Sequence, residues 1–495
     1  MRTGGWVVMF VSGLLALGGC RPPDDEPCPV DTAPDSDLPG PPTTTDDSDP
    51  PPTGDTDTRP PPDTDQPAGP WPSALRFSGP VPQNLLVISI DTLRLDRIGF
   101  FAQTDTTPFL DGRLRKSAVL TDLRGCSNWT YSSLLCLFSG QSTVELGFEP
   151  VTSDPAAEAP PEELPGVPLW LQEAGYQTAV VTGSPFLTTD PGVVTGGGFQ
   201  TIVYDDWGNA ADFPDADWVV EQGVEQVERL METPESPWML QLHFMDPHTP
   251  FSAPESYRKG HEDLAPIPYD LTSAEDYGQA QRDYAGMSQE ERDLLVAHIE
   301  MFYLADLRFL DEWLGTLWDQ LDALGALEDT LVMFWTDHGE QHYEHNRIGH
   351  SQALYQEENR ALAAFWAPGI ESGPLPMPAM HQDLWPTVFN LLQIPQQAST
   401  TGLGLANIAD DRLRTAFRYQ STSSARLMVT RSDKVLLYAS DGRKAFYDAA
   451  TDPLELTDLY DAKDADVIAL WDDMDQQIDD VLTYLPHLVF EDRGP

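Results

Sequence analysis

The sequence predicts an α/β fold in which a mainly parallel β-sheet is sandwiched between helices. The main evidence is three short runs of mostly apolar residues, the pattern expected of strands that are buried on both faces. Each run leads directly into polar residues. The runs span residues 84–90, 239–245 and 330–335, and they lead into Asp91, into Asp246 and His248, and into Asp337 and His338.

The ends of these three strands predict one shared site. Ligands of open α/β sheets bind outside the carboxyl ends of the strands. A single Asp after a strand is more often a helix cap or a turn former than a functional residue. Three strands that all end in Asp or His favour a functional site at one edge of the sheet.

Length and charge limit the possible partners. A chain of 495 residues allows one large α/β domain with a smaller companion and disordered ends. Its formal charge of -52 argues against nucleic-acid binding, because phosphate backbones attract Lys and Arg and are repelled by acids. A site for an anionic substrate must then be locally positive, through a metal ion, helix N-termini or His.

Residues 1–19 are predicted to be a signal peptide. The apolar segment from Trp6 to Leu17 is too short for a transmembrane helix and has the length of a signal-peptide core. Leu17-Gly18-Gly19-Cys20 looks like a bacterial lipobox, which predicts cleavage before Cys20 and lipidation of its sulfur. The alternative is an uncleaved signal with an incidental Cys. The lipobox predicts a lipid-anchored protein of the bacterial cell envelope, and Arg21 is compatible with the outer membrane or cell surface.

Residues 20–75 are predicted to form a disordered tether. They consist largely of Pro, Asp and Thr, so almost nothing in them can be buried to offset the entropy of ordering. Beyond the tether, Cys126 and Cys136 are ten residues apart, across a predicted strand-to-helix turn. A disulfide and two buried free thiols are equally compatible with that spacing.

The remaining elements are predicted in order along a domain of residues 80–410. The leucines of a long helix that starts near residue 290 recur every three or four residues, which indicates core packing. After residue 410 the pattern changes to short strands and a final acidic helix, which predicts a C-terminal subdomain at 411–495. The other predicted elements are a helix ending near 175, strands at 176–182 and 361–366, a helix at 219–231, and strands at 426–430, 434–438 and 445–447.

The opening strand, Asp91 and residues 126–140 together resemble the sulfatase family within the alkaline phosphatase superfamily. The resemblance covers residues 82–460 and implies an alkaline-phosphatase-like fold with a small antiparallel C-terminal subdomain. Asp91, Asp337 and His338 fall on metal-ligand positions of that family. Sulfatases usually have a second acid after the first, whereas Thr92 stands here.

Thr130 falls where sulfatases carry the Cys or Ser that is converted to formylglycine. Ser132 and Leu134 replace the Pro and Arg of the conversion signal, so no formylglycine is expected. A Thr at this position resembles the phosphoryl-transferring branches of the superfamily, in which a metal-activated hydroxyl attacks phosphorus. The alternative is that Thr130 only caps the following helix.

Two histidines complete the implied site. His248, between Pro247 and Pro250, matches a family motif whose His contacts the substrate ester, and the alternative is a loop His bonded to a backbone carbonyl. His350 falls where sulfatases place a Lys that contacts the sulfate group. The loop at 183–187 lacks the basic residues that grip sulfate in that family.

The resemblance implies a metal-dependent hydrolase of anionic sulfate or phosphate esters with Thr130 as the nucleophile. One divalent metal is expected. A mixed oxygen and imidazole set favours Mn²⁺ or Zn²⁺, with Ca²⁺ and Mg²⁺ as alternatives. Two other functions remain open: transfer of a phosphoryl group to another acceptor, and a non-catalytic lipoprotein that uses the fold for binding.

Overall fold

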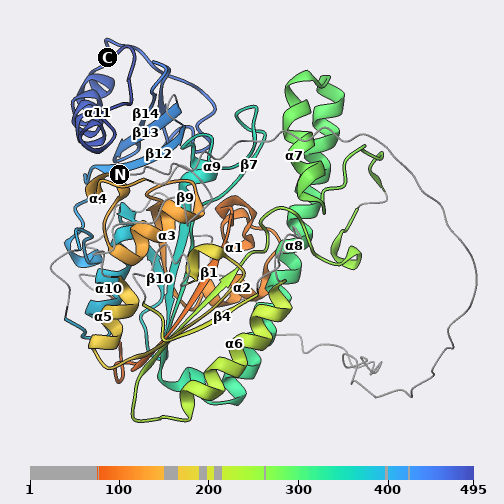
Figure 1. Cartoon of the computed structure of the whole chain (residues 1–495), viewed down its shortest axis with the longest axis vertical. Helices are drawn as coiled ribbons and strands as arrows, with labels where there is room; N and C mark the ends of the chain where they lie inside the picture. Colours follow the sequence, from red (N-terminus) through yellow and green to blue (C-terminus); the bar gives the residue numbers. More distant parts are fainter. Residues whose placement is uncertain are drawn as a thin grey trace, which may run out of the picture. The chain divides into compact units, whose positions relative to one another are not determined.

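The computed structural model describes residues 75, 77–149, 166–188, 198–205, 215–260, 263–395, 400–421 and 424–495 (Figure 1). The predicted signal peptide, Cys20 and all but the last residue of the predicted tether lie outside these ranges. Within the described ranges, no helix combines the length and apolar character needed to cross a bilayer.

The central sheet confirms the predicted mainly parallel architecture. Its strands lie in the order β10-β2-β9-β6-β1-β5-β3-β4, with β11 also paired to β2. Only β9 runs antiparallel to its neighbours, β2 and β6. The strands are β1 (Asn84–Ile90), β2 (Ala118–Arg124), β3 (Gln177–Thr182), β4 (Thr201–Tyr204), β5 (Trp238–Phe244), β6 (Thr330–Thr336), β9 (Arg360–Trp366), β10 (Gly373–Leu375) and β11 (Ala379–Met380).

The three apolar runs of the sequence form three adjacent strands. β1 lies between β5 and β6 and is parallel to both. Successive side chains of a strand point to opposite faces. Leu86 and Ile88 of β1 therefore pack into the core on one side of the sheet, and Leu85 and Val87 into the core on the other. This double burial explains why the runs show no polar alternation.

Helices cover both faces of the sheet (Figure 1). The core on one side includes residues of α2 (Pro108–Leu114), α6 (Ala216–Met231) and α8 (Gln289–Ala323), with the short α1 (Gly99–Ala102) beside them. The core on the other side includes α3 (Thr130–Ser139), α5 (Val167–Glu173) and α10 (Leu384–Leu391). The sandwich of helices around the sheet is as predicted.

The long helix α8 starts one residue before its predicted start. A capping box fixes this end, because the Ser288 side chain accepts a hydrogen bond from the Glu291 backbone and the Glu291 carboxylate accepts one from the Ser288 backbone. Of its leucine stripe, Leu307, Leu310, Leu314, Leu317 and Leu321 are buried, as expected for core packing. The sequence of residues 252–295 shows no clear hydrophobic period, and in the structure α7 (Ala274–Asp283) lies there with only Tyr277 and Ala280 of that helix buried.

A second, antiparallel sheet follows, as the sequence predicted for the C-terminal region. It consists of β12 (Arg414–Ser421), β13 (Ser424–Arg431), β14 (Lys434–Ala439) and β15 (Lys444–Asp448). Trp471, Met474 and Ile478 of α11 (Ala465–Tyr484) pack against this sheet in a separate core. The shorter elements are α4 (Thr143–Leu146), β7 (Gln341–His342), β8 (Ile348–Gly349) and α9 (Gln356–Asn359).

Candidate active site

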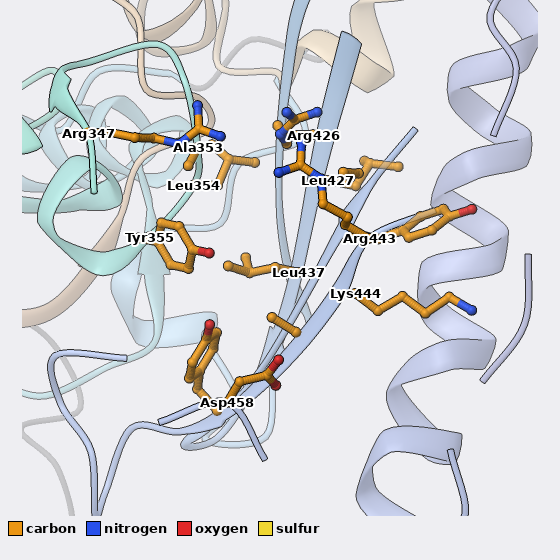
Figure 2. Close-up of a pocket in the computed structure, with 14 residues that line it drawn as sticks. Arg347, Ala353, Leu354, Tyr355, Arg426, Leu427, Leu437, Arg443, Lys444 and Asp458 are labelled. Carbon is orange, nitrogen blue, oxygen red and sulfur yellow. The ribbon is translucent and has the colours of Figure 1, made fainter. Parts of the chain in front are cut away.

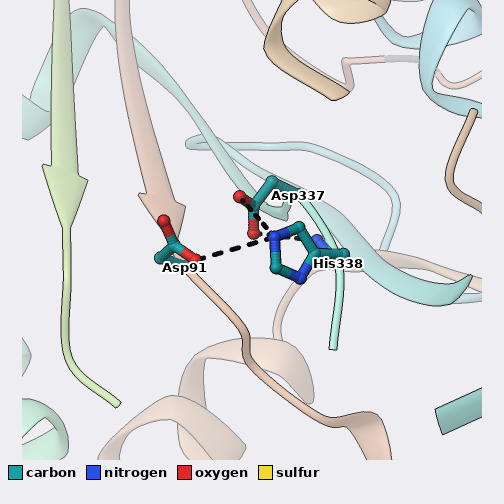
Figure 3. Close-up of side chains that lie close together, drawn as sticks. All are labelled: Asp91, Asp337 and His338. Atoms are coloured by element: carbon teal, nitrogen blue, oxygen red, sulfur yellow. Dashed lines mark hydrogen bonds and ion pairs between the residues drawn. The ribbon is translucent and has the colours of Figure 1, made fainter. Parts of the chain in front are cut away.

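Asp91, Asp337 and His338 lie together at the carboxyl edge of the central sheet (Figure 3). The register of β1 and β6 explains their proximity, because Ile90 pairs with Thr336 and the next residue of each strand is an aspartate. Each of the three side chains offers one ligand atom, and these atoms lie within 4.8 Å of one another. The structure therefore brings the three predicted metal ligands together.

The electrostatics of this group suit a bound cation. Burial and the charge of Asp91 raise the pKa of Asp337 to about 7. Burial would also raise the pKa of Asp91, but His248, His243 and His338 outweigh that effect and lower it. Asp91 Oδ1 and Asp337 Oδ2 are buried and make no hydrogen bond. Buried carboxylate oxygens without hydrogen bonds are costly unless a cation binds them, so the residues fit a divalent metal.

Thr130 is the first residue of α3, and its hydroxyl faces the metal-ligand group. Its Oγ1 lies 3.2 Å from Asp91 Oδ2 and 3.2 Å from His338 Nε2. The residue at the cap position is Trp129, which makes no side-chain cap hydrogen bond, so the reading of Thr130 as a helix cap is wrong. The first N–H groups of a helix lack intrahelical partners, which makes this end of α3 suited to an anion.

His248 and His350 extend the site beyond His338. The ring centroids of His338 and His350 lie 4.5 Å apart, and those of His350 and His248 lie 5.1 Å apart. His350 Nδ1 is 3.3 Å from Glu340 Oε1, and His248 Nδ1 is 2.5 Å from the carbonyl oxygen of Thr249. Both side chains are partly exposed. All six predicted site residues therefore form one continuous group.

His243 also belongs to this group, and the sequence reasoning missed it. It is buried within β5, and its Nε2 lies 3.6 Å from Asp91 Oδ2. Its Nδ1 is hydrogen-bonded at 2.8 Å to Ser89 Oγ, and the two residues pair across β1 and β5. The signal that could have revealed it is a His inside a mostly apolar strand, paired with the residue two positions before Asp91.

Other polar residues that are close to the predicted site residues in the sequence lie outside the metal-ligand group in the structure. Asp246 follows β5, but its carboxylate contacts Ser252 and not the metal-ligand group. His342 is buried and paired with Glu300 at 3.0 Å. His345 pairs with Glu357 and stacks on Tyr355. Among the described residues, the group that could hold a metal includes neither of these histidines.

The raised pKa values of Asp246 and Asp306 lead to a predicted pH dependence of the stability of the fold. Burial raises the pKa of Asp306 to about 7, and burial with the charges of Asp306 and Asp215 raises that of Asp246 well above its usual value. Raised carboxyl pKa values stabilise the fold below the unfolded-state pKa, and this contribution is lost as pH rises through about 7. Asp246→Asn removes one charge, so its melting temperature should fall less than that of the wild type between about pH 5 and about pH 8.

The matched control for this measurement is Asp319→Asn, which changes an exposed carboxylate on α8. Its melting temperature should follow that of the wild type across the same pH range. If the melting temperatures of the wild type and Asp246→Asn depend equally on pH, the raised pKa of Asp246 is contradicted.

Cys126 and Cys136 form a disulfide, which resolves the choice that the sequence left open. The bond ties the turn before α3 to the middle of that helix.

The disulfide between Cys126 and Cys136 should stabilise the folded protein by about 2–3 kcal/mol, according to the chain-entropy account for a loop of this size. Cys136→Ser is therefore expected to lower the free energy of unfolding in urea by about that amount. The same variant compared with the wild type under reducing conditions is the control, since the difference should then vanish.

Residues 83–394 match the model of the Sulfatase family. This match covers more than half of the chain, so the protein belongs to the sulfatase family. The expected family and the alkaline-phosphatase-like fold are thereby confirmed.

Curated relatives match part of the chain. An arylsulfatase of Clostridium perfringens is 24% identical over 272 residues, which cover 52% of this chain and 56% of the relative. A choline-sulfatase of Rhizobium meliloti is 28% identical over 239 residues, which cover 45% of this chain and 46% of the relative. The chain thus spans about half the length of these relatives.

Solved structures share the fold over a longer range. A phosphonate monoester hydrolase from Silicibacter pomeroyi has a TM-score of 0.61 at 18% identity, covering 81% of this chain and 95% of that chain. A protein in complex with its substrate D-glucosamine-2-N,6-O-disulfate has a TM-score of 0.63 at 16% identity, covering 83% and 99%.

Proposed function

We propose that this protein is a metal-dependent hydrolase of sulfuric or phosphoric esters with Thr130 as its nucleophile. The observation that carries the proposal is the place of Thr130 Oγ1, 3.2 Å from both Asp91 Oδ2 and His338 Nε2. One hydroxyl therefore contacts two of the three residues that fit a metal. Membership of the sulfatase family supports the same reaction class.

Asp91, Asp337 and His338 would hold one divalent cation, which would lower the pKa of a nucleophilic hydroxyl and stabilise negative charge on the ester oxygens. Two carboxylates and one imidazole favour Mn²⁺ or Zn²⁺ over Ca²⁺ or Mg²⁺, which prefer all-oxygen sites. The proposal requires no formylglycine, because Thr130 supplies its own hydroxyl.

The residues of the chain account for each bond that changes. Thr130 donates a hydrogen bond to Asp91 Oδ2, which places this carboxylate to take the proton as Oγ1 attacks sulfur or phosphorus. The bond between the ester oxygen and sulfur or phosphorus then breaks, and His248 or His350 gives that oxygen a proton. Water finally attacks the sulfur or phosphorus of the Thr130 ester and gives a proton to His248 or His350, while the bond to Oγ1 breaks and Asp91 returns its proton to Oγ1. The N-terminus of α3 stabilises the negative charge during both steps.

Sulfate and phosphate esters are separated by assay. The full chain is incubated with an aryl sulfate, an aryl phosphate and an aryl phosphodiester, each with Mn²⁺, Zn²⁺ or Ca²⁺. The unmodified Thr130 and the imidazole of His338 favour phosphoryl transfer, so the phosphate ester should react fastest. Inactivity on every ester with every metal would refute the proposal and favour the binding function.

Mass spectrometry of Thr130 after a substrate pulse tests the covalent step. Product trapping with added alcohols tests transfer to an acceptor other than water.

We further propose that the protein is held in the bacterial envelope by a lipid on Cys20. The support is the sequence Leu17-Gly18-Gly19-Cys20 and the Pro- and Asp-rich stretch after it. The wild type expressed in a bacterial host should enter the detergent phase of a Triton X-114 extraction, and Cys20→Ser should remain aqueous. Detergent partitioning of both proteins alike would refute the lipid anchor.

A further inference from the structure

A pocket rich in arginine lies between the loop that carries His350 and the C-terminal antiparallel sheet (Figure 2). Its volume is about 260 Å³. Arg347 comes from the loop, Arg426 from β13, and Arg443 from the turn before β15. Figure 2 shows their three side chains meeting at one end of the cavity, while Lys444 points away. We call this cavity the arginine pocket.

The arginine pocket is unusual in so acidic a protein. The chain has 28 Lys and Arg against 80 Asp and Glu. Within the described residues, neither Arg347 nor Arg426 forms an ion pair with a carboxylate. Arg347 Nη1 donates to Gln352 Oε1 at 3.2 Å, and Arg426 Nη1 donates to the carbonyl oxygen of Ala425 at 2.9 Å. Each guanidinium therefore keeps donors and its full positive charge available to a ligand.

The remaining charges leave this end of the pocket positive. Arg443 is paired with Asp441 at 2.7 Å and is 61% exposed, so it lies at the surface. Asp458 also lines the cavity, but it lies at the opposite end and accepts backbone hydrogen bonds from Phe446 and Tyr460. Burial and the charges of Arg443 and Arg347 lower the pKa of Arg426. An anion placed among the guanidinium groups would relieve that repulsion.

Much of the remaining wall is apolar and aromatic. Leu354, Leu427 and Leu437 line the cavity together with Tyr355 and Tyr447, whose ring centroids lie 6.0 Å apart. A cluster of guanidinium groups above such a wall suits an oxyanion attached to a small ring or short chain. The volume is near the lower end of the ~300–1,000 Å³ typical of small-molecule sites.

We propose that Arg347 and Arg426, with Arg443 at the rim, form a second anion-binding site that takes a tetrahedral oxyanion, sulfate or phosphate, either as part of the substrate or free in solution. His350 lies in the same loop as Arg347 and Tyr355, with Arg347 three residues before it and Tyr355 five residues after it. A substrate that carries two charged groups could thus be held at the catalytic centre and at the arginine pocket. The proposal that the pocket holds part of the substrate rests on the proposed ester hydrolase function, whereas the proposal that it binds a free anion does not.

The first test measures binding without catalysis. Sodium sulfate is titrated calorimetrically into the full chain at low ionic strength. Arg347→Met and Arg426→Met should each weaken the pocket site about tenfold or more, since each removes charge-assisted hydrogen bonds. Arg431→Met is the matched control, because Arg431 lies on the same strand but pairs with Asp473, and it should leave binding unchanged. Asp337→Ala should also leave this binding intact.

Two results would overturn the proposal. One is the absence of any sulfate site in the wild type. The other is a site that Asp337→Ala removes and Arg426→Met does not. Circular dichroism checks that each variant folds, and Arg443→Met, at a mostly exposed position, provides a second variant if a more buried change fails to fold.

A second measurement identifies the source of the anion. Arg426→Met should raise KM for D-glucosamine-2-N,6-O-disulfate about tenfold while leaving kcat, and KM for 4-nitrophenyl sulfate, unchanged if the pocket holds a second group of the substrate. If Arg426→Met leaves the kinetics on both esters unchanged but still loses the sulfate site measured by calorimetry, the pocket binds a free anion. If neither ester reacts with the wild type, the hydrolase proposal fails and the calorimetry still decides the pocket.

Discussion

Replacing Thr130 by alanine is expected to lower turnover of the best ester substrate by about 10³-fold or more, because removal of a nucleophile costs at least that much in other hydrolases. Thr130→Ser keeps the hydroxyl and should retain far more activity than Thr130→Ala. The rates are compared by kcat under saturating substrate and metal, and the covalent adduct on residue 130 should disappear in the alanine variant alone.

Structural damage would confuse this comparison, so metal content and melting temperature are measured on the same samples. Thr130 is not the residue at the cap position of α3, and its hydroxyl is hydrogen-bonded to Asp91 and His338 of the site, so both quantities should stay close to the wild type. Wild-type activity in Thr130→Ala would mean that water attacks the ester directly.

Replacing Asp337 by alanine is expected to remove the bound metal. Asp337 supplies a buried carboxylate beside Asp91 and His338, and loss of even an outer-shell partner usually weakens metal binding by about 10–100-fold. The loss of a ligand should exceed that. Elemental analysis of the purified protein should give about one divalent ion per wild-type chain and almost none for the variant, in line with the single ligand group.

Asp246→Asn is the matched control for metal binding. Asp246 also follows a buried strand of the same sheet, but its side chain contacts Ser252. The metal content of Asp246→Asn should equal that of the wild type. Wild-type protein that contains no divalent metal would contradict the assigned centre.

The sequence predicted those parts of the fold whose burial leaves a clear pattern. β1, β5 and β6 are buried on both faces, so their boundaries follow from apolar runs and differ from the prediction by at most one residue. The parallel register then brings Asp91 beside Asp337. Thr130 could be placed only through its resemblance to a family motif, because a Thr before a helix has the same local pattern when it is a cap.

Elements stabilised by buried polar residues escaped prediction. β12 contains Arg414 and Arg418, which look like surface residues in the sequence but are buried and paired with Asp122 and Glu149. His243 escaped for a similar reason, since its partners Ser89 and Asp91 lie about 150 residues away along the chain. The arginine pocket likewise combines residues from three separate segments, which spacing in the sequence cannot reveal.

The pairing of β1 with β6 also means that the candidate metal-ligand group is complete only late in synthesis of the chain. β1 is the first strand of the sheet in the chain, yet its ligand-bearing neighbour is made only after the whole of α8. A partly synthesised chain therefore has Asp91 without Asp337 and His338, and it has no complete set of ligands. Capture of a metal at this group would require closure of the sheet, so a chain that ends before β6 would hold no ion there even if its earlier helices had folded.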